Sequence, residues 1–178
     1  MPTLRIAKEN EDETHFLTFR VIEWINVFTE PAYFQILIES LKFCQRNKGL
    51  LLHGYVVMTN HVHIICTAKN GNLSSIIQGF KSYTSYEIKK TLGNDHRNYI
   101  LRLIKRSYFK RKGHDFQIWH SENWSVYVKS DWFLNQKLDY IHDNPVVKRY
   151  VEQPEDWLYS SARNYILEDN SVIEIDEV

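Results

Sequence analysis

The order in which β-rich and helical segments follow one another along this chain leaves few folds open to it. Dense β-forming residues run over 14–24, 50–58 and 61–67, and again, with Trp and Tyr, over 116–128. Three segments with apolar residues at helical spacing are interspersed among them. The order is strand, helix, strand, strand, helix, strand, helix. It predicts an α+β fold, a ferredoxin-like sandwich with helices packed on a mostly antiparallel sheet.

The helical segments have recognisable starts and stops. The first follows Thr29, which we expect to cap it, and the second follows Asn72. The third opens at Ser130, and Pro145 is expected to stop or kink it. Residues 91–112, between the second and third helices, are polar and are expected to be irregular.

A chain of 178 residues that is 43% hydrophobic suits a single globular domain. We expect this domain to span residues 1–178, with a core over about 14–150 and a covering tail over 151–178. Cys44 and Cys66 both lie in apolar stretches, which favours reduced, buried thiols in a cytoplasmic protein. No apolar run approaches ~18 residues, so no membrane span is expected.

The segment His61-Val62-His63 places two imidazoles two residues apart on an expected strand. Side chains at that spacing project from the same face and can converge on one metal ion. A solvated or hydrogen-bonded histidine pair is the alternative. A metal needs more ligands than these two, and no cysteine pair lies nearby. The pattern therefore favours an open, partly hydrated ion that also binds a substrate phosphate, rather than a structural zinc.

Tyr140 lies on the last expected helix, on one face with Lys137 and Asn144, which are three residues before it and four after it. A phenol, with a reference pKa near ~10, is a weak nucleophile unless a cation or base assists it. A metal-bound phosphate would give that assistance. The chain has 11 tyrosines, and packing is the ordinary role of such residues. The position of Tyr140 alone therefore leaves its role open.

His61-Val62-His63 resembles the His-hydrophobic-His motif of HUH nucleases. The string Leu138-Asp139-Tyr140-Ile141-His142-Asp143-Asn144-Pro145-Val146 resembles the tyrosine-helix signature of the REP-associated tyrosine transposases. Pro154-Glu155-Asp156-Trp157, followed by Ser160-Ser161, is similar to a tail motif of the same family. The three motifs occur in order, and the resemblance covers about residues 16–165.

This resemblance implies a single-tyrosine, metal-dependent transposase and endonuclease that acts on single-stranded DNA beside short hairpin repeats. His61, His63 and Asn144 would hold Mg²⁺ or Mn²⁺. Tyr140 would attack a phosphodiester, which gives a 5′-phosphotyrosine link and a free 3′-hydroxyl. Strand transfer would be the reverse reaction with a different 3′-hydroxyl.

The sequence around Asn144 bears on the third metal ligand and on the connection that follows the helix. Asn144 precedes a proline, which biases it out of helical geometry. If the helix ended one residue early, His120 or Glu122 would be substitute ligands. In addition, Val147-Lys148-Arg149-Tyr150 stand where the family usually carries a small residue and a glycine.

The formal net charge of zero conceals an uneven distribution of charge. Ten basic residues fall within 81–112, interspersed with tyrosines and opposed only by Glu87 and Asp95. Basic grooves with stacking rings suit single-stranded nucleic acid, and a solvated helix face with a flexible loop is the alternative. The expected DNA-binding residues are Lys81, Lys89, Lys90, Arg102, Lys105, Arg106, Lys110, Arg111 and Lys112.

Other functions remain possible from the sequence. One is a DNA- or RNA-binding module on the same fold with catalysis lost, and another is a plasmid relaxase or replication initiator. The acting form can be a monomer or a homodimer. The acidic tail, with eight acids over residues 151–178, is expected to lie in the basic groove and compete with DNA.

Overall fold

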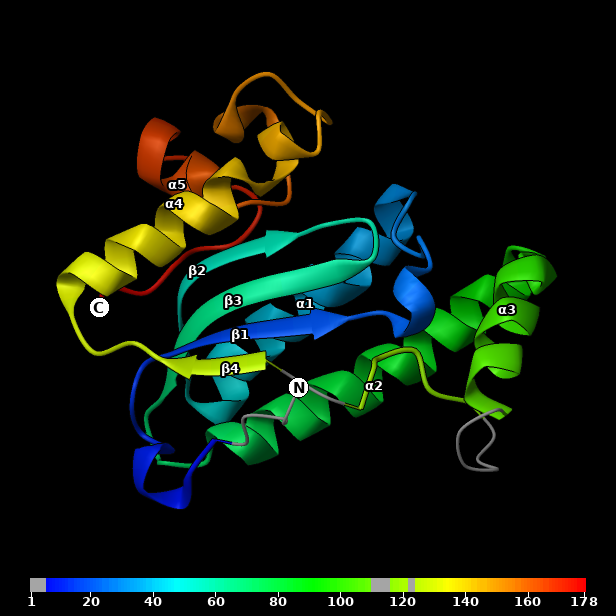
Figure 1. Cartoon of the computed structure of the whole chain (residues 1–178), viewed down its shortest axis with the longest axis horizontal. Helices are drawn as coiled ribbons and strands as arrows, with labels where there is room; N and C mark the ends of the chain where they lie inside the picture. The colour runs from blue at the N-terminus through cyan, green and yellow to red at the C-terminus, as the bar shows by residue number, and fades with distance from the viewer. Residues whose placement is uncertain (1–5, 110–115, 122–123) are drawn as a thin grey trace.

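The structure is a computed structural model, and it describes residues 6–109, 116–121 and 124–178. Its centre is a four-stranded antiparallel sheet with strand order β2-β3-β1-β4 (Figure 1). The strands are β1 (His15–Arg20), β2 (Leu50–Val57), β3 (His61–Ala68) and β4 (Trp124–Tyr127). The α-helices are α1 (Pro31–Lys48), α2 (Leu73–Asn94), α3 (Asn98–Phe109), α4 (Asp131–Val147) and α5 (Ala162–Leu167). Short 3-10 helices span Lys8–Asn10, Ile22–Trp24 and Pro154–Asp156. This architecture confirms the predicted α+β sandwich.

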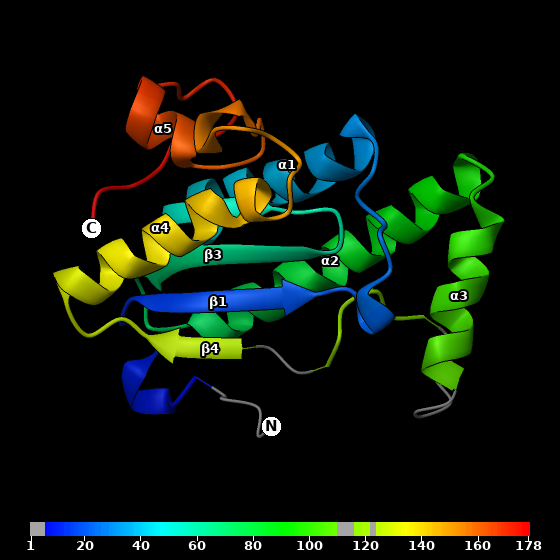
Figure 2. The same ribbon diagram turned by 45° about the horizontal axis from the view of Figure 1, so that its top comes forward.

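The alternation of side chains along β3 explains why helices cover both faces of the sheet. Val62, Ile64 and Cys66 point into the larger core, which is shared with α1 and α2. His61, His63 and Ile65 point to the opposite face, where Ile65 joins a smaller cluster with apolar residues of α4. Figure 2 shows α4 in front of the sheet and α1 and α2 behind it. The histidine pair therefore faces the same layer as α4.

The first strand is shorter than expected over residues 14–24. It ends at Arg20, and the 3-10 helix Ile22–Trp24 follows. The chain turns here because Val21 N–H donates to Asn60 O (2.8 Å) and Ile22 N–H donates to Ile118 O (2.9 Å). The fourth strand likewise covers only Trp124–Tyr127 of the predicted 116–128.

The helix starts predicted at Asn72 and Ser130 are right, because these residues occupy the N-cap positions of α2 and α4. Ser130 caps α4, since its side chain accepts a bond from Phe133 N–H. Glu30, rather than Thr29, occupies the N-cap of α1, and the Asn72 side chain makes no capping bond at α2.

The prediction of irregular structure over residues 91–112 is wrong for most of the described part of this range, 91–109, and residues 110–112 lie outside the described residues. The helix α2 continues to Asn94, and α3 spans Asn98–Phe109. Ile100 and Ile104 anchor α3, since both are buried in the larger core. One side of α3 packs against α2 and the 3-10 helix Ile22–Trp24.

Of the two effects expected of Pro145, a stop or a kink, the stop does not occur, because α4 runs through it to Val147. Pro145 and Asn144 are both buried, and packing holds Asn144 in the helix despite the bias that proline imposes on its neighbour.

The acidic tail does not lie in the basic groove, because it covers the outer edge of β2. Val57 N–H donates to Tyr159 O (2.9 Å), and Asp176 N–H donates to Leu52 O (2.7 Å). Ile173 is buried in the larger core. The expectation that the tail lies in the basic groove is therefore wrong.

Both cysteines are buried and unpaired, as expected. Across the described residues, no helix combines the length and the apolar character needed to cross a membrane.

Candidate active site

Tyr140 and the histidine pair meet on the face of the sheet that α4 covers. The ring of Tyr140 lies 5.4 Å from that of His63, edge to face, and His63 lies 4.9 Å from His61 (centroid distances). Phe16 on β1 stacks on His63 at 5.4 Å and fixes the plane of that imidazole. Tyr140 is 51% exposed, so its phenol lies at the surface of the site, where a large substrate can reach it.

The two imidazoles are oriented through their Nδ1 atoms. His61 Nδ1 lies 2.7 Å from Asn60 Oδ1, and His63 Nδ1 lies 2.7 Å from Thr18 Oγ1. Thr18 and His63 are paired across β1 and β3. Contacts of this kind at Nδ1 leave Nε2 of each ring as the nitrogen available to a metal.

Asn144 supplies an oxygen next to this pair. Its Oδ1 is buried and, among the described residues, has no hydrogen-bond partner. Its side chain is close enough to His61 to act on the pKa of that imidazole. A buried amide oxygen without a partner is costly, and a bound cation would satisfy it. One amide oxygen with two imidazoles is a donor set that fits Mg²⁺ or Mn²⁺.

Other third ligands are not supported. No cluster of three His, Cys, Asp or Glu side chains occurs in the described part of the chain. His120 is buried, and its backbone N–H donates to Arg20 O (2.8 Å). Glu122 lies outside the described residues.

Both histidines of the pair are neutral near pH 7. Burial and the nearby Lys148 lower the pKa of His61 to about 4, against an opposing effect of Asn144. Burial, His61 and Lys137 hold the pKa of His63 well below its usual value. Since a histidine binds metal through its neutral form, the site is kept ready for a cation at physiological pH.

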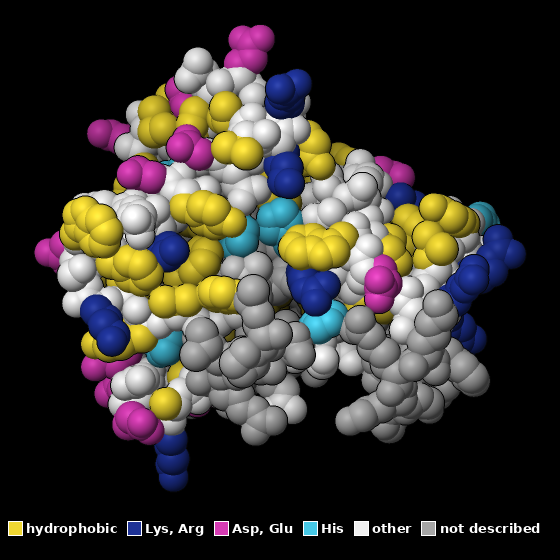
Figure 3. All heavy atoms as spheres, in the orientation of Figure 1, with side chains coloured by type: hydrophobic (Ala, Val, Ile, Leu, Met, Phe, Trp, Pro, Cys, Tyr) yellow, Lys and Arg dark blue, Asp and Glu magenta, His cyan; other side chains and the backbone are white. Residues whose placement is uncertain are grey.

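Cations surround the site at a short distance. Lys137 Nζ lies 5.8 Å from the ring centroid of Tyr140, and Arg20 is the cross-strand partner of His61. Figure 3 shows histidines in the middle of this face, with Lys and Arg side chains around them and, at the right, over α3. These positive charges suit a phosphodiester.

Several residues near the site were missed from the sequence: Thr18, Arg20, Trp24, Asn60 and Lys148. The first two occupy alternate positions of β1, so period-2 alternation could have placed them on one face. Which face that is depends on the register between β1 and β3, which no local pattern reveals.

The expected DNA-binding residues divide into three groups. Five of them are exposed: Lys89 and Lys90 on α2, and Arg102, Lys105 and Arg106 on α3. Lys81 points inward, where Nζ donates to His120 O (3.1 Å) and burial lowers its pKa to about 8. The remaining three, Lys110, Arg111 and Lys112, lie outside the described residues.

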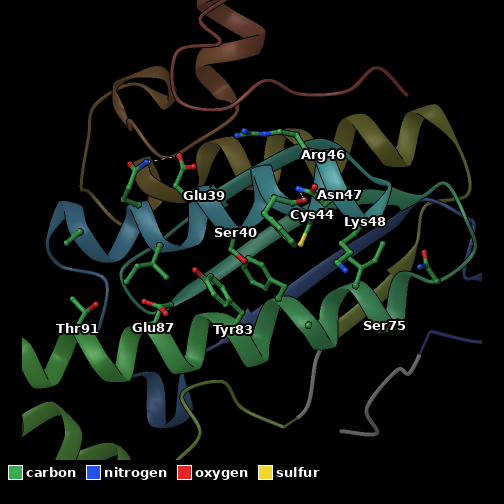
Figure 4. A pocket seen from close by; sticks show the side chains of 18 residues that line it. Glu39, Ser40, Cys44, Arg46, Asn47, Lys48, Ser75, Tyr83, Glu87 and Thr91 are labelled. Atoms are coloured by element: carbon green, nitrogen blue, oxygen red, sulfur yellow. Dashed lines mark hydrogen bonds between the residues drawn. The ribbon is translucent and has the colours of Figure 1, made fainter.

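A cavity of about 1080 Å³ lies between α1 and α2 (Figure 4). Ser40 and Cys44 line it from α1, and Tyr83 and Glu87 from α2. It lies on the sheet face opposite to the histidine pair and takes no part in the site described above.

Comparison with known proteins finds relatives of this chain. Residues 14–131 match the profile of the family described as "Transposase IS200 like". A curated protein of Haemophilus influenzae, which carries the name REP-associated tyrosine transposase, is 27% identical over 107 residues, or 59% of this chain and 54% of that protein. The chain thus spans about half the length of that relative.

A solved structure is similar over most of the chain. It is that of a REP-associated tyrosine transposase bound to a REP hairpin, with a TM-score of 0.63 at 19% identity, over 94% of this chain and 86% of that one. At this identity the likeness shows a common fold.

Proposed function

The chain belongs to the IS200-like transposase family, and from this premise we propose that it cleaves and rejoins single-stranded DNA beside short hairpin repeats. The observation that carries the proposal is the position of Tyr140, 5.4 Å from His63 on the open side of the site. The relative bound to a REP hairpin supports a hairpin as the DNA partner here.

The proposed reaction is a transesterification. Tyr140 Oη attacks the phosphorus of a phosphodiester and loses its proton to solvent. The bond from phosphorus to the 3′-oxygen breaks, and that oxygen takes up a proton and leaves as a 3′-hydroxyl. The 5′ end of the DNA remains bonded to Tyr140. Attack by another 3′-hydroxyl on this link reverses the step and rejoins the strand.

The side chains around Tyr140 have definable parts in this reaction. The Lys137 ammonium, 5.8 Å from the ring centroid of Tyr140, adds positive charge where the phosphodiester would bind. Arg20, beside His61, offers a guanidinium to a phosphate oxygen. His61, His63 and Asn144 would hold Mg²⁺ or Mn²⁺, which when bound supplies Lewis-acid polarisation of the scissile phosphate.

The test is capture of the covalent link. The protein is incubated with Mn²⁺ and a labelled pool of hairpin-bearing single strands with randomised flanks, and adducts are read on a denaturing gel. We expect an adduct with the unaltered protein and none with Tyr140→Phe or with EDTA. Tyr86→Phe, which alters another exposed tyrosine, should retain the adduct.

Two results would contradict the proposal. Persistence of the adduct in Tyr140→Phe would assign the nucleophile elsewhere. Tight binding of the pool without any adduct would favour the alternative, a nucleic-acid-binding module on this fold.

A further inference from the structure

Trp24 presents an exposed ring at the edge of the site, in a backbone conformation that is costly to maintain. Its side chain is 51% exposed. Glu23 (φ 51°) and Trp24 (φ 55°) both have left-handed backbone, which non-glycine residues rarely adopt. Backbone strain of this kind persists only where surrounding structure enforces it, and it concentrates at functional sites.

The structure that enforces this turn is the same that positions His61. Asn60 Nδ2 donates to Trp24 O (3.1 Å), while Asn60 Oδ1 contacts His61 Nδ1. The indole and the His61 imidazole are in T-shaped contact, with ring centroids 5.7 Å apart and planes at 78°. The location of Trp24 is therefore coupled to that of a proposed metal ligand.

A cation completes the surroundings of the ring. The Arg20 guanidinium carbon lies 5.3 Å from the Trp24 ring centroid, in a cation–π contact. Arg20 is also paired with His61 across β1 and β3. An exposed aromatic ring with a guanidinium beside a phosphate site is the combination that binds one unpaired nucleotide, since the ring stacks on the base and the cation faces the backbone.

The helix α3, next to the 3-10 helix of Trp24, extends the proposed path of the DNA strand. The helix α3 packs against the 3-10 helix that carries Trp24. The exposed cations Arg102, Lys105 and Arg106 lie on α3. A strand that passes from Tyr140 over the histidines to α3 therefore has Trp24 along its path.

We propose that Trp24 is a stacking platform for an unpaired base next to the cleaved phosphodiester, with Arg20 held beside it for the adjoining phosphate. This inference rests on the proposed function for its ligand. It concerns binding, however, so its test does not depend on cleavage.

The test uses the Tyr140→Phe protein and the strand that it binds best from the randomised pool. We expect Trp24→Ala to weaken binding about 5- to 150-fold, the loss of one stacked base. Trp24→Phe, which keeps a ring, should retain most of the affinity. Trp132→Ala, at a tryptophan that is 72% exposed on α4, is the matched control and should leave affinity unchanged.

A second arm alters the DNA and leaves Trp24 intact. Single 2-aminopurine substitutions along the flank should show quenching at one position, and Trp24→Ala should abolish it. A single abasic site at that position should weaken binding to the same extent as Trp24→Ala.

The platform would be overturned if Trp24→Ala bound the strand as tightly as the Tyr140→Phe protein without it. It would also be overturned if no single abasic site weakened binding. Such a result alongside a Tyr140-dependent adduct removes the platform and leaves the proposed function standing. Position-specific quenching without any adduct would support the platform and contradict the proposed function.

Discussion

Asn60 contacts three neighbours with one amide group. Its Nδ2 donates to Trp24 O (3.1 Å) and to Asn26 Oδ1 (3.0 Å), which fixes the orientation of the amide. Its Oδ1 therefore faces His61 Nδ1, and since an amide oxygen only accepts, that nitrogen carries the proton. The lone pair of His61 is thereby placed on Nε2, so Asn60 is a positioning residue for a proposed metal ligand.

Asn60→Ala should lower Mn²⁺ affinity about 10- to 100-fold, the usual effect of losing a partner behind a metal-binding histidine. Titration calorimetry measures the affinity, and nitrogen chemical shifts of His61 report its tautomer without metal. Asn47→Ala, on α1 across the sheet, is the control and should change neither. Unaltered Mn²⁺ affinity together with an unaltered tautomer would remove Asn60 from this role.

The sequence located the reactive groups better than it located their supports. The resemblance to the tyrosine-helix signature singled out Tyr140, and the spacing of His61 and His63 singled out the histidine pair; the structure brings them to one face of the sheet. Asn60 escaped notice because the orientation of its amide depends on its contacts with Trp24 and Asn26, and Arg20 because its position depends on strand pairing. Arg20 meets His61 only through the register of β1 against β3.

The packing of α4 on β2 sets the distance between Tyr140 and the sheet. Gly54 permits this contact, because a Cβ there would lie 2.7 Å from Leu138 Cδ2 and 3.2 Å from Ile141 Cδ1. Both leucine and isoleucine belong to the smaller core, so little space is left for them to move aside.

Gly54→Ala should therefore destabilise the protein by about 1–3 kcal/mol, as overpacking does, and displace α4. Urea unfolding gives the stability, and adduct yield at saturating DNA gives the effect on Tyr140. Gly79→Ala is the matched control. Its Cβ would meet nothing within 4 Å, so it should stabilise α2 by about 0.5–1 kcal/mol. Equal stability of the two variants would refute the packing argument.

His142 joins α4 to the C-terminal segment and makes that junction sensitive to acid. Its Nε2 lies 2.8 Å from Ser161 Oγ, which in turn donates to Tyr55 O. Burial lowers the pKa of His142 to about 4, against 6.5 ordinarily. The folded state thus binds fewer protons than the unfolded state between these values, so stability is complete above pH 6.5 and declines as pH falls toward 4.

The contribution of His142 to this decline is about 3 kcal/mol. Its pKa lies ~2.5 below the ordinary value, and each pH unit of that difference corresponds to ~1.4 kcal/mol. Urea unfolding at pH 7.5 and 4.5 should show a smaller loss of stability for His142→Gln than for the unaltered chain. Buried His53, His61 and His63 act in the same direction, so the difference between the two proteins isolates His142. The same pH dependence of stability in His142→Gln and in the unaltered chain would exclude His142 as a source of the acid sensitivity.

Strands and helices with clear apolar spacing were predictable, and α3 shows where that signal failed. Among its described side chains, Ile100 and Ile104 are buried in the core and Leu101 packs against it, while Arg102, Lys105 and Arg106 are exposed. The continuation of α4 through Pro145 escaped prediction for a related reason. Burial of Asn144 and Pro145 between layers outweighs the local preference, and no local pattern reports that burial.

The positive charges of α3 and those of α1 lie in different parts of the molecule. The helix α3, with its exposed cations, packs against the 3-10 helix that carries Trp24, whereas α1 lies on the face of the sheet opposite to His61 and His63. Replacing Arg102, Lys105 and Arg106 by Gln should weaken binding and reduce the slope of log affinity against log salt by about 2, at ~0.7 for each phosphate contact.

The matched control replaces three cations of α1, Lys42, Arg46 and Lys48, by Gln. It changes the net charge equally and should leave the slope near its original value. A similar reduction in both variants would mean that DNA affinity follows net charge rather than a track along α3.

One chain brings the proposed reactive groups together without help from a second. Tyr140 contacts His63 of its own chain. The outer edge of β2, where another sheet could pair, is covered by the chain's own C-terminal segment through Tyr159 and Asp176. We therefore expect Tyr140 to act with the histidines of the same chain.

Mixing Tyr140→Phe with His61→Ala tests this expectation, because each variant carries the group that the other lacks. If subunits exchanged their tyrosine helices, some mixed dimers would hold one intact site and form the covalent adduct. We expect the mixture to form none after prolonged co-incubation, while the unaltered protein diluted into either variant retains its yield. Adduct formation in the mixture would show that the site is shared between two chains and that the contact of Tyr140 with its own His63 is not the one that cuts DNA.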